Sequence, residues 1–519
     1  MEAHELKSRV SVSSRPMPKD SRSVRENDNA HLQRMGKKPV LKRNFGVISI
    51  FGFSCTILGT WEGLLGTFVR PLQNGGSAGA IYAFIFAWVG TASVFVVLAE
   101  LASMAPTAGG QYHWAAMLAP VRYQKFLSYM TGAIGWLAVL GWQTGLASLA
   151  FLTGTTIQGA AILGNSHYEA FPWHGTLLVW AALVFALVAN LAGGKVLPRV
   201  ETMTLVAHIV GFFGILIPLT YMSEQKSPQE LFSQFSNGGG FPTQGLAWFM
   251  AEEVENASRV IPLVTMLTVG INGCLGFGIL LAILFCDGNI QEALDSSTGY
   301  PFMWMFHQAT NSIPGSLAMC AVVIVNFCCS LVGMLAATSR QLWSFSRDKG
   351  TPGWQFWSQV TQSERLPANA IILTALISIL LALINIGSSV ALDDILSMAV
   401  SGIYLSYLMV ATLLFRRRLR GEISSYNTSD EDIVNVPGAK LVWGPFHCPG
   451  IWGILVNGFA MCYIFIVVFF SFWPSKVNPS PDEMNWSVMG VGCCIILGLV
   501  YYFVRARHVY TGPIRELAI

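Results

Sequence analysis

The chain is divided into apolar segments of about 20 residues or more, the length that an α-helix needs to cross a bilayer. Hydrophobic residues make up 53% of the 519 residues and charged residues only 11%, whereas soluble domains carry about 25% charged residues. This composition predicts an all-α polytopic membrane protein. Eleven clear spans are expected, at residues 45–69, 79–103, 127–160, 174–194, 202–222, 263–286, 315–338, 369–390, 395–415, 451–473 and 486–505.

The two ends of the chain differ from this apolar part. Residues 1–43 hold eleven Lys or Arg against five Asp or Glu, and no Phe, Trp or Tyr. Such a segment cannot bury enough apolar surface to order itself, so we expect a disordered, basic tail on the cytoplasmic side. The transmembrane domain is expected at 44–507, followed by a short cytoplasmic tail at 508–519.

The basic loops test the number of crossings independently of hydropathy. With the basic tail inside, the loops at 122–125 and 195–199 fall on the cytoplasmic side, as the positive-inside rule demands. The later basic clusters at 340–349, 416–420 and 505–507 fall on that side only if the chain crosses the membrane once more after the fifth span. A total of eleven crossings would place all three clusters outside.

The additional crossing is needed near residue 245. Residues 237–262 read NGGGFPTQGLAWFMAEEVENASRVIP, and only 245–250 are continuously apolar. Six residues cannot span a bilayer. Two explanations remain open: 241–250 form a short re-entrant piece, or about 20 residues are absent from this version of the chain.

The end of the second span carries a distinctive motif, ELASMAPTAGGQYHW at Glu100–Trp114. A carboxylate lies where the helix should be ending, and Pro106 and the following Gly pair prevent it from continuing. Tyr112 and Trp114 suit the aromatic belt at the membrane interface. The motif is typical of a transporter, although an ordinary helix stop would read similarly.

Four motifs together resemble the amino acid–polyamine–organocation superfamily, in particular its fungal amino-acid/choline transporter branch with GABA and choline permeases. They are FSCTILGTWEGLLG at Phe53–Gly66, ELASMAPTAGGQYHW, MAEEVENASRVIP at Met250–Pro262 and ATSRQLWSFSRDKG at Ala337–Gly350. The resemblance implies twelve spans, with two inverted repeats of five helices, two extra C-terminal helices, and a substrate site where the first and sixth helices are broken. Here the sixth helix is truncated, as a mispredicted gene model, a splice form or a decayed gene would explain.

The substrate site is expected at the broken first helix, where glycines interrupt an apolar run and free backbone groups to face a cavity. Close helix packing is the structural alternative for these glycines. Glu62 is expected to serve as a counter-charge for a substrate amine or in a proton relay, unless it is solvated in an outer vestibule. The expected substrate-binding residues are Thr56, Ile57, Leu58, Gly59, Thr60, Trp61 and Glu62, with Trp142, Gln143, Asn326 and Tyr404 as further cavity residues.

Other charges are expected at the inner side of the membrane. These inner-gate or topology charges are Glu252, Glu253, Arg259, Arg340 and Arg347. The chain contains no HExxH motif and no nucleotide-binding loop. We therefore expect no enzyme activity, no metal and no cofactor. The expected partners are a small amino acid or amine, protons and the lipid bilayer, and not nucleic acid.

These observations predict a multi-pass secondary active permease for amino acids or related amines such as GABA or choline. Proton coupling and alternating access are the expectation from the family. A transport-inactive sensor or defective splice form is the first alternative, and an exporter of a cationic secondary metabolite is the second. The plasma membrane is the expected location, with an internal membrane as the alternative.

Overall fold

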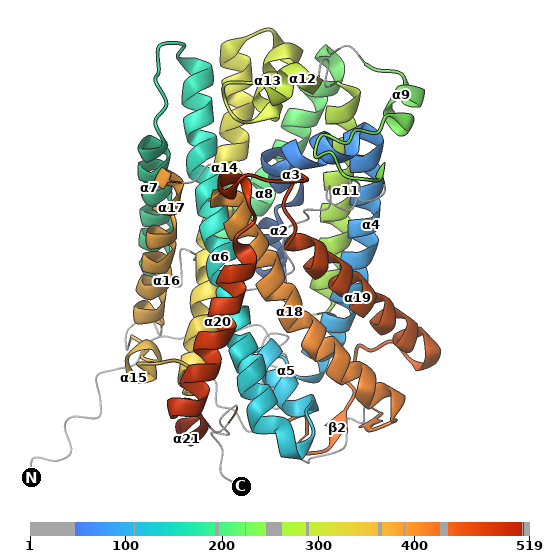
Figure 1. The fold of residues 1–519 in the computed structure, drawn as a ribbon, viewed down its shortest axis with the longest axis vertical. Coiled ribbons are helices and arrows are strands. Elements are labelled where there is room, and N and C mark those ends of the chain that lie inside the picture. Colours follow the sequence, from blue (N-terminus) through green and yellow to red (C-terminus); the bar gives the residue numbers. More distant parts are fainter. Residues whose placement is uncertain are drawn as a thin grey trace, which may run out of the picture.

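The structure is a computed structural model, and it describes residues 47–107, 109–192, 197–223, 225–244, 262–286, 290–361, 366–387, 391–425, 434–510 and 512. Within these ranges, ten helices are long and apolar enough to cross a membrane. They run side by side as one helical bundle (Figure 1). The expected all-α polytopic architecture is confirmed.

The long helices are α4 (Val69–Met104), α6 (Gln124–Gly164), α7 (Pro172–Leu191), α8 (Leu197–Met222), α11 (Pro262–Phe285), α14 (Ile313–Arg347), α16 (Ala368–Leu381), α18 (Ala391–Leu419), α19 (Gly450–Ser471) and α20 (Ser487–Tyr501). The shorter elements are α2 (Val47–Leu58), α3 (Thr60–Thr67), α5 (Gln111–Leu118), η1 (Val121–Tyr123), α9 (Pro228–Ser233), α12 (Ile290–Leu294), α13 (Pro301–Thr310), α15 (Trp354–Trp357), α17 (Ile384–Gly387), β1 (Ile423–Ser424), β2 (Leu441–Val442), η2 (Pro481–Glu483), η3 (Tyr502–Ala506) and α21 (Arg507–Val509). The two short strands pair in parallel. The longest helix, α6, packs against α7, α14 and α18 and so lies at the centre of the bundle.

The first predicted span accounts for the difference between eleven expected and ten observed long helices. In the structure it is divided into α2, with 12 residues, and α3, with 8 residues. Neither part alone reaches the length of a membrane-spanning helix. The interruption lies at Gly59, between the two helices.

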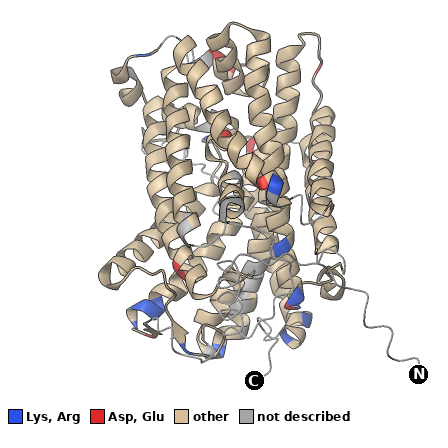
Figure 2. Ribbon diagram, turned by 180° about the vertical axis from the view of Figure 1, so that it is seen from behind, with Lys and Arg blue, Asp and Glu red and all other residues tan. Residues whose placement is uncertain are grey.

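Most Lys and Arg residues lie toward one end of the bundle, where α5, α15 and α21 lie (Figures 1 and 2). The arginines at 416–420 and 505–507 belong to this end, because α18 and the final helices finish there. The positive-inside rule makes this end the cytoplasmic one. We call it the inner end, and the opposite end, with α9, α12 and α13, the outer end.

The extra crossing required by the charges falls between Gln244 and Pro262. Residues 236–244 are tied to the outer end, where Gln244 donates a hydrogen bond to the Ser236 carbonyl. Helix α11 also finishes at the outer end, because the Phe285 carbonyl accepts a hydrogen bond from the Lys226 amide. Its 24 residues extend about 36 Å, so α11 begins toward the inner end. Residues 245–261, which include the truncated sixth helix, lie outside the described residues.

The prediction of an interfacial position for Tyr112 and Trp114 is wrong. Both side chains are buried, in a short helix, α5, that packs against α6 and α18 at the inner end. The Tyr112 hydroxyl donates to Asp348 at 2.7 Å, and the Trp114 indole donates to the Ala105 carbonyl at 2.9 Å. The polar atoms of both side chains therefore form hydrogen bonds within the protein, and the aromatic rings are part of the buried core at the inner end.

Candidate functional site

The break between α2 and α3 is built on one glycine. Gly59 has φ 41° and ψ 42°, a left-handed conformation that L-residues with a side chain rarely adopt. Its amide donates to the Cys55 carbonyl at 3.0 Å, and its carbonyl accepts from the Gly63 amide at 2.7 Å. The chain therefore turns at this residue and α3 starts afresh inside the bundle, so that its N-terminal end is directed toward protein and not toward lipid.

A buried acid–base pair lies one turn beyond the break. The Nδ1 atom of His208, on α8, lies 2.6 Å from Oε1 of Glu62, on α3, and the two side chains are 1% and 2% exposed. Glu62 is therefore not solvated in a vestibule. Within the described residues, neither Glu62 Oε2 nor His208 Nε2 has a hydrogen-bond partner. An ionisable pair at this depth is costly, which makes it a functional candidate by default.

Trp61 and Asn326 complete a polar cluster around this pair. The Trp61 ring lies 5.8 Å from the His208 ring and is fully buried. Gly211, one turn beyond His208 on α8, separates Trp61 from Asn326 on α14, and a Cβ atom there would lie 3.2 Å from the Asn326 amide nitrogen. Among the described residues, Trp61 Nε1 and Asn326 Oδ1 also have no hydrogen-bond partner.

A pocket opens on the other side of the break, between α3, α4 and α11. It is a small cavity of about 30 Å³ in this conformation, room for roughly one water molecule. We call it the central pocket, and its lining residues are Leu58, Thr60, Phe84, Trp88, Thr91, Val269, Asn272 and Gly273. The lining combines two aromatic rings with hydroxyl and amide groups.

The polar atoms of the central pocket are partly engaged. The Trp88 indole donates to the Val269 carbonyl at 3.1 Å, which ties α4 to α11. The Thr91 hydroxyl lies 3.3 Å from the Tyr463 hydroxyl. Asn272 Oδ1 is buried and, in the described part of the chain, has no hydrogen-bond partner. An oxygen acceptor therefore remains beside the two aromatic rings.

Comparison with known proteins agrees with this architecture. The model of the amino acid permease family matches residues 45–495. The chain belongs to the amino acid permease family. A choline transporter of Saccharomyces cerevisiae is 27% identical, over 89% of this chain and 80% of that protein. An amino-acid permease of Arabidopsis thaliana is 26% identical, over 95% of this chain and 98% of that protein. Amino-acid permease 2 of Neurospora crassa is 24% identical, over 95% of this chain and 90% of that protein. The chain is therefore a transporter and not an enzyme.

These relatives contain residues that this permease lacks. The match to the Arabidopsis protein extends over 533 positions, although 95% of 519 residues is only about 493. The match to the yeast protein extends over 485 positions, although 89% of 519 residues is only about 462. Each relative thus carries at least about 20 residues without a counterpart here, enough for one membrane-spanning helix.

The remaining predicted cavity residues of the permease contact different parts of the bundle. Ile57 of α2 and Trp142 of α6 belong to the same buried hydrophobic cluster. The Gln143 amide donates to Thr374 of α16 at 3.1 Å, and no described contact brings it to Glu62. Tyr404 lies 6.2 Å from Tyr463, ring to ring. Thr56 belongs to α2, but its side chain is outside the described residues.

The predicted gate charges are only partly described. Glu252, Glu253 and Arg259 lie outside the described residues. Arg340 is half-buried on α14 and interacts electrostatically with Glu201 of α8. Arg347, at the inner end of the same helix, lies over the Trp343 ring at 4.9 Å. Their role as gate or topology charges stays a prediction.

The sequence analysis missed His208, Asn272 and the aromatic pair Phe84 and Trp88. His208 had a signal, because it is an ionisable residue inside the apolar fifth span and such residues usually mark function. The others had none, since a single Asn, Phe or Trp in a span is ordinary. Only their position beside Gly59 distinguishes them.

Proposed function

We propose that this permease carries an amino acid or a related small amine, such as GABA or choline, across a membrane by secondary active transport. Relatives named as amino-acid permeases and as a choline transporter support this substrate range. The plasma membrane is the proposed location. The mechanism is alternating access, in which α3 and the elements around it rearrange to open the site first to one side and then to the other.

The substrate is proposed to bind beside the break at Gly59. The N-terminal end of α3 carries the positive end of its dipole and suits a carboxylate. Phe84 and Trp88 line the central pocket, where aromatic rings can attract an ammonium group, and the free Asn272 oxygen can accept a hydrogen bond from it. One site can thus hold the two ends of an amino acid, or the ammonium end of choline.

Proton coupling is proposed to use the Glu62–His208 pair. Both residues can hold a proton, they are in hydrogen-bond contact, and both are almost fully buried between α3 and α8. Adding or removing one proton changes the net charge of the pair beside the substrate, so protonation and substrate binding become linked. This buried pair is the observation that carries the coupling proposal.

Uptake into proteoliposomes tests the proposal. The full chain is reconstituted, and uptake of radiolabelled GABA, choline and amino acids is followed with and without an inward proton gradient. We expect accumulation that a protonophore abolishes, and loss of the gradient dependence in Glu62→Gln. Glu483→Gln, at an exposed carboxylate of the outer end, is the matched control and should transport normally. Accumulation that is indifferent to the gradient would refute proton coupling.

A transport-inactive product remains the second candidate, because of the short connection between Gln244 and Pro262. Its 17 residues would extend about 26 Å as a helix, less than the roughly 30 Å hydrocarbon core. Full-length cDNA across the codons for 245–252 decides between the two. A transcript with about 20 additional codons would restore the sixth helix, whereas a direct join of Phe249 to Met250 in every transcript, with no uptake, would favour the inactive product.

A further inference from the structure

A second pocket lies at the inner end, where α18 finishes and α19 begins. Its free space is about 810 Å³, part of it open to solvent. We call it the inner pocket, and the residues that line it include Arg418, Trp443, His447, Cys448 and Gly450. It is remote from the break at Gly59 and takes no part in the proposed transport site.

Arg418 lines the inner pocket. Its side chain is only 6% exposed, and Nη2 lies 2.5 Å from Oε2 of Glu100 on α4. Nη1 donates to the Cys448 carbonyl at 2.8 Å, while the second Glu100 oxygen accepts from the Cys448 amide at 2.6 Å. The charge of Glu100 is thus compensated on both oxygens. Arg418 Nε has no hydrogen-bond partner in the described structure.

Other donors converge on the same pocket. His447 stacks on Trp443 at 5.3 Å, and its buried Nδ1 has no hydrogen-bond partner among the described residues. Helix α19, with 22 residues, begins at Gly450 without a side-chain cap, so its first amides carry the positive end of the helix dipole. A guanidinium, an imidazole and a helix N-terminus together suit an anion with several oxygen atoms.

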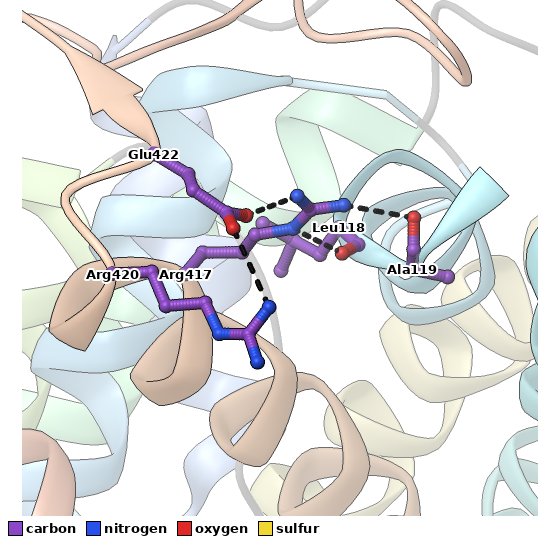
Figure 3. Close-up of polar contacts among 5 residues, drawn as sticks. All are labelled: Leu118, Ala119, Arg417, Arg420 and Glu422. Carbon is purple, nitrogen blue, oxygen red and sulfur yellow. Dashed lines mark hydrogen bonds and ion pairs between the residues drawn. The ribbon is translucent and has the colours of Figure 1, made fainter.

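The surroundings of the inner pocket are basic on one side. Arg417 is occupied, because it donates to the carbonyls of Leu118 and Ala119 at the end of α5 and pairs with Glu422 (Figure 3). Arg420 is 56% exposed and reaches Glu422 only at 3.7 Å (Figure 3). Arg416 is also exposed, on the same last turn of α18. These two exposed charges add to the positive potential around the pocket.

On its other side the inner pocket meets the lipid-facing surface of α19. Ile451, Trp452 and Leu455 are 64%, 69% and 55% exposed. They follow immediately after Gly450, which lines the pocket, and in a membrane protein such side chains contact acyl chains. The pocket therefore lies at the level where lipid headgroups meet the hydrocarbon core, on the leaflet that carries anionic lipids.

We propose that the inner pocket binds the phosphate-containing headgroup of an anionic phospholipid of the cytoplasmic leaflet, with the acyl chains along Ile451 and Leu455 of α19. Arg418, His447 and the first amides of α19 hold the phosphate. Arg416 and Arg420 attract the anionic headgroup. The bound lipid would bridge α18 and α19 beside the Glu100–Arg418 contact, and so stabilise the inner end of the bundle.

The test uses the purified full-length protein after removal of bound lipid. Thermal unfolding is measured with vesicles of phosphatidylcholine alone, with vesicles containing phosphatidylserine or phosphatidylinositol, and with inorganic phosphate. We expect stabilisation by the anionic vesicles only. The apparent affinity should fall about fivefold in Arg420→Gln, as removal of one basic residue near an anionic surface predicts, and further in His447→Ala.

Lys476→Gln is the matched control, because Lys476 is 55% exposed and lies at the outer end, next to Glu483. It removes the same charge and should leave lipid binding unchanged. Equal stabilisation by phosphatidylcholine, or an equal loss in the control variant, would overturn the proposal. Full stabilisation by inorganic phosphate alone, with no further effect of vesicles, would assign the pocket to a free anion and refute the lipid.

Discussion

The burial of the Glu62–His208 pair predicts that replacing His208 lowers the free energy of unfolding. In His208→Leu the Glu62 carboxylate keeps its buried position, 2% exposed, but loses the atom that lies 2.6 Å away. For a pair that is ionised, removing one partner costs about 3–5 kcal/mol, because an uncompensated charge remains in the interior. We expect a loss of this size in the free energy of unfolding.

A second substitution should recover part of this loss. Adding Glu62→Gln to His208→Leu removes the charge and leaves only a buried amide, whose unmade hydrogen bond costs about 1–3 kcal/mol. The double variant should therefore be more stable than His208→Leu by about 1–3 kcal/mol. Unfolding by dodecyl sulfate in mixed micelles, followed by circular dichroism, provides the measurement.

The exposed pair Lys476–Glu483 serves as the control cycle. Its side chains are 55% and 41% exposed, so the same pair of substitutions there, Lys476→Leu and Glu483→Gln, should show no coupling that the assay can resolve. If Glu62→Gln brings no recovery in the His208→Leu background, the carboxylate carries no buried charge, and the coupling mechanism proposed for this pair is refuted.

Three further predictions concern other parts of the chain. Gly59→Ala should cost about 1–2 kcal/mol, because its left-handed backbone disfavours a side chain, and uptake should fall while the amount of membrane-inserted protein stays constant; unchanged uptake would contradict the role of the break. Tyr112→Phe removes a hydrogen bond to the buried Asp348 and should cost about 1.5–3 kcal/mol, measured as a lower melting temperature; a variant as stable as the parent would show that this bond contributes nothing. The pKa of Glu422 is lowered, chiefly by the hydrogen bond from Arg417, so its contribution to stability is present above the usual carboxyl pKa and lost as the pH falls through the lowered pKa. The difference in melting temperature between the parent and Glu422→Gln should therefore disappear in acid, and a difference that grows on acidification would reverse the sign of this argument.

The positions of the membrane spans could be predicted from the sequence alone. A helix in lipid satisfies its own backbone groups and needs an apolar surface of fixed length, so each span is a local property of about 20 residues. The positive charges indicated whether the number of crossings is even or odd for a similar reason. The Lys and Arg content of each loop decides on which side of the membrane that loop lies. The break at Gly59 also had a local signal, since glycines interrupt an otherwise apolar run.

The prediction from local sequence was wrong for Tyr112 and Trp114. Aromatic residues beside a span usually lie at the interface, yet here both are buried, because α5 turns back beneath α6 and α18. A sequence pattern reports that a helix ends, but not where the following residues pack. The direction of α5 depends on contacts with helices that are distant in the chain.

What the sequence by itself determined, then, is the set of long helices and the stretch of the first span that is interrupted, whereas it left the crossing near residue 245 open. The tertiary structure alone decided which side chains meet: Glu62 with His208, 146 residues apart, and Glu100 with Arg418, 318 residues apart. Lipid imposes the same apolar surface on every span, so hydropathy cannot distinguish one neighbour from another. Only the packing of the helices selects the partners, and the two candidate sites depend on that selection.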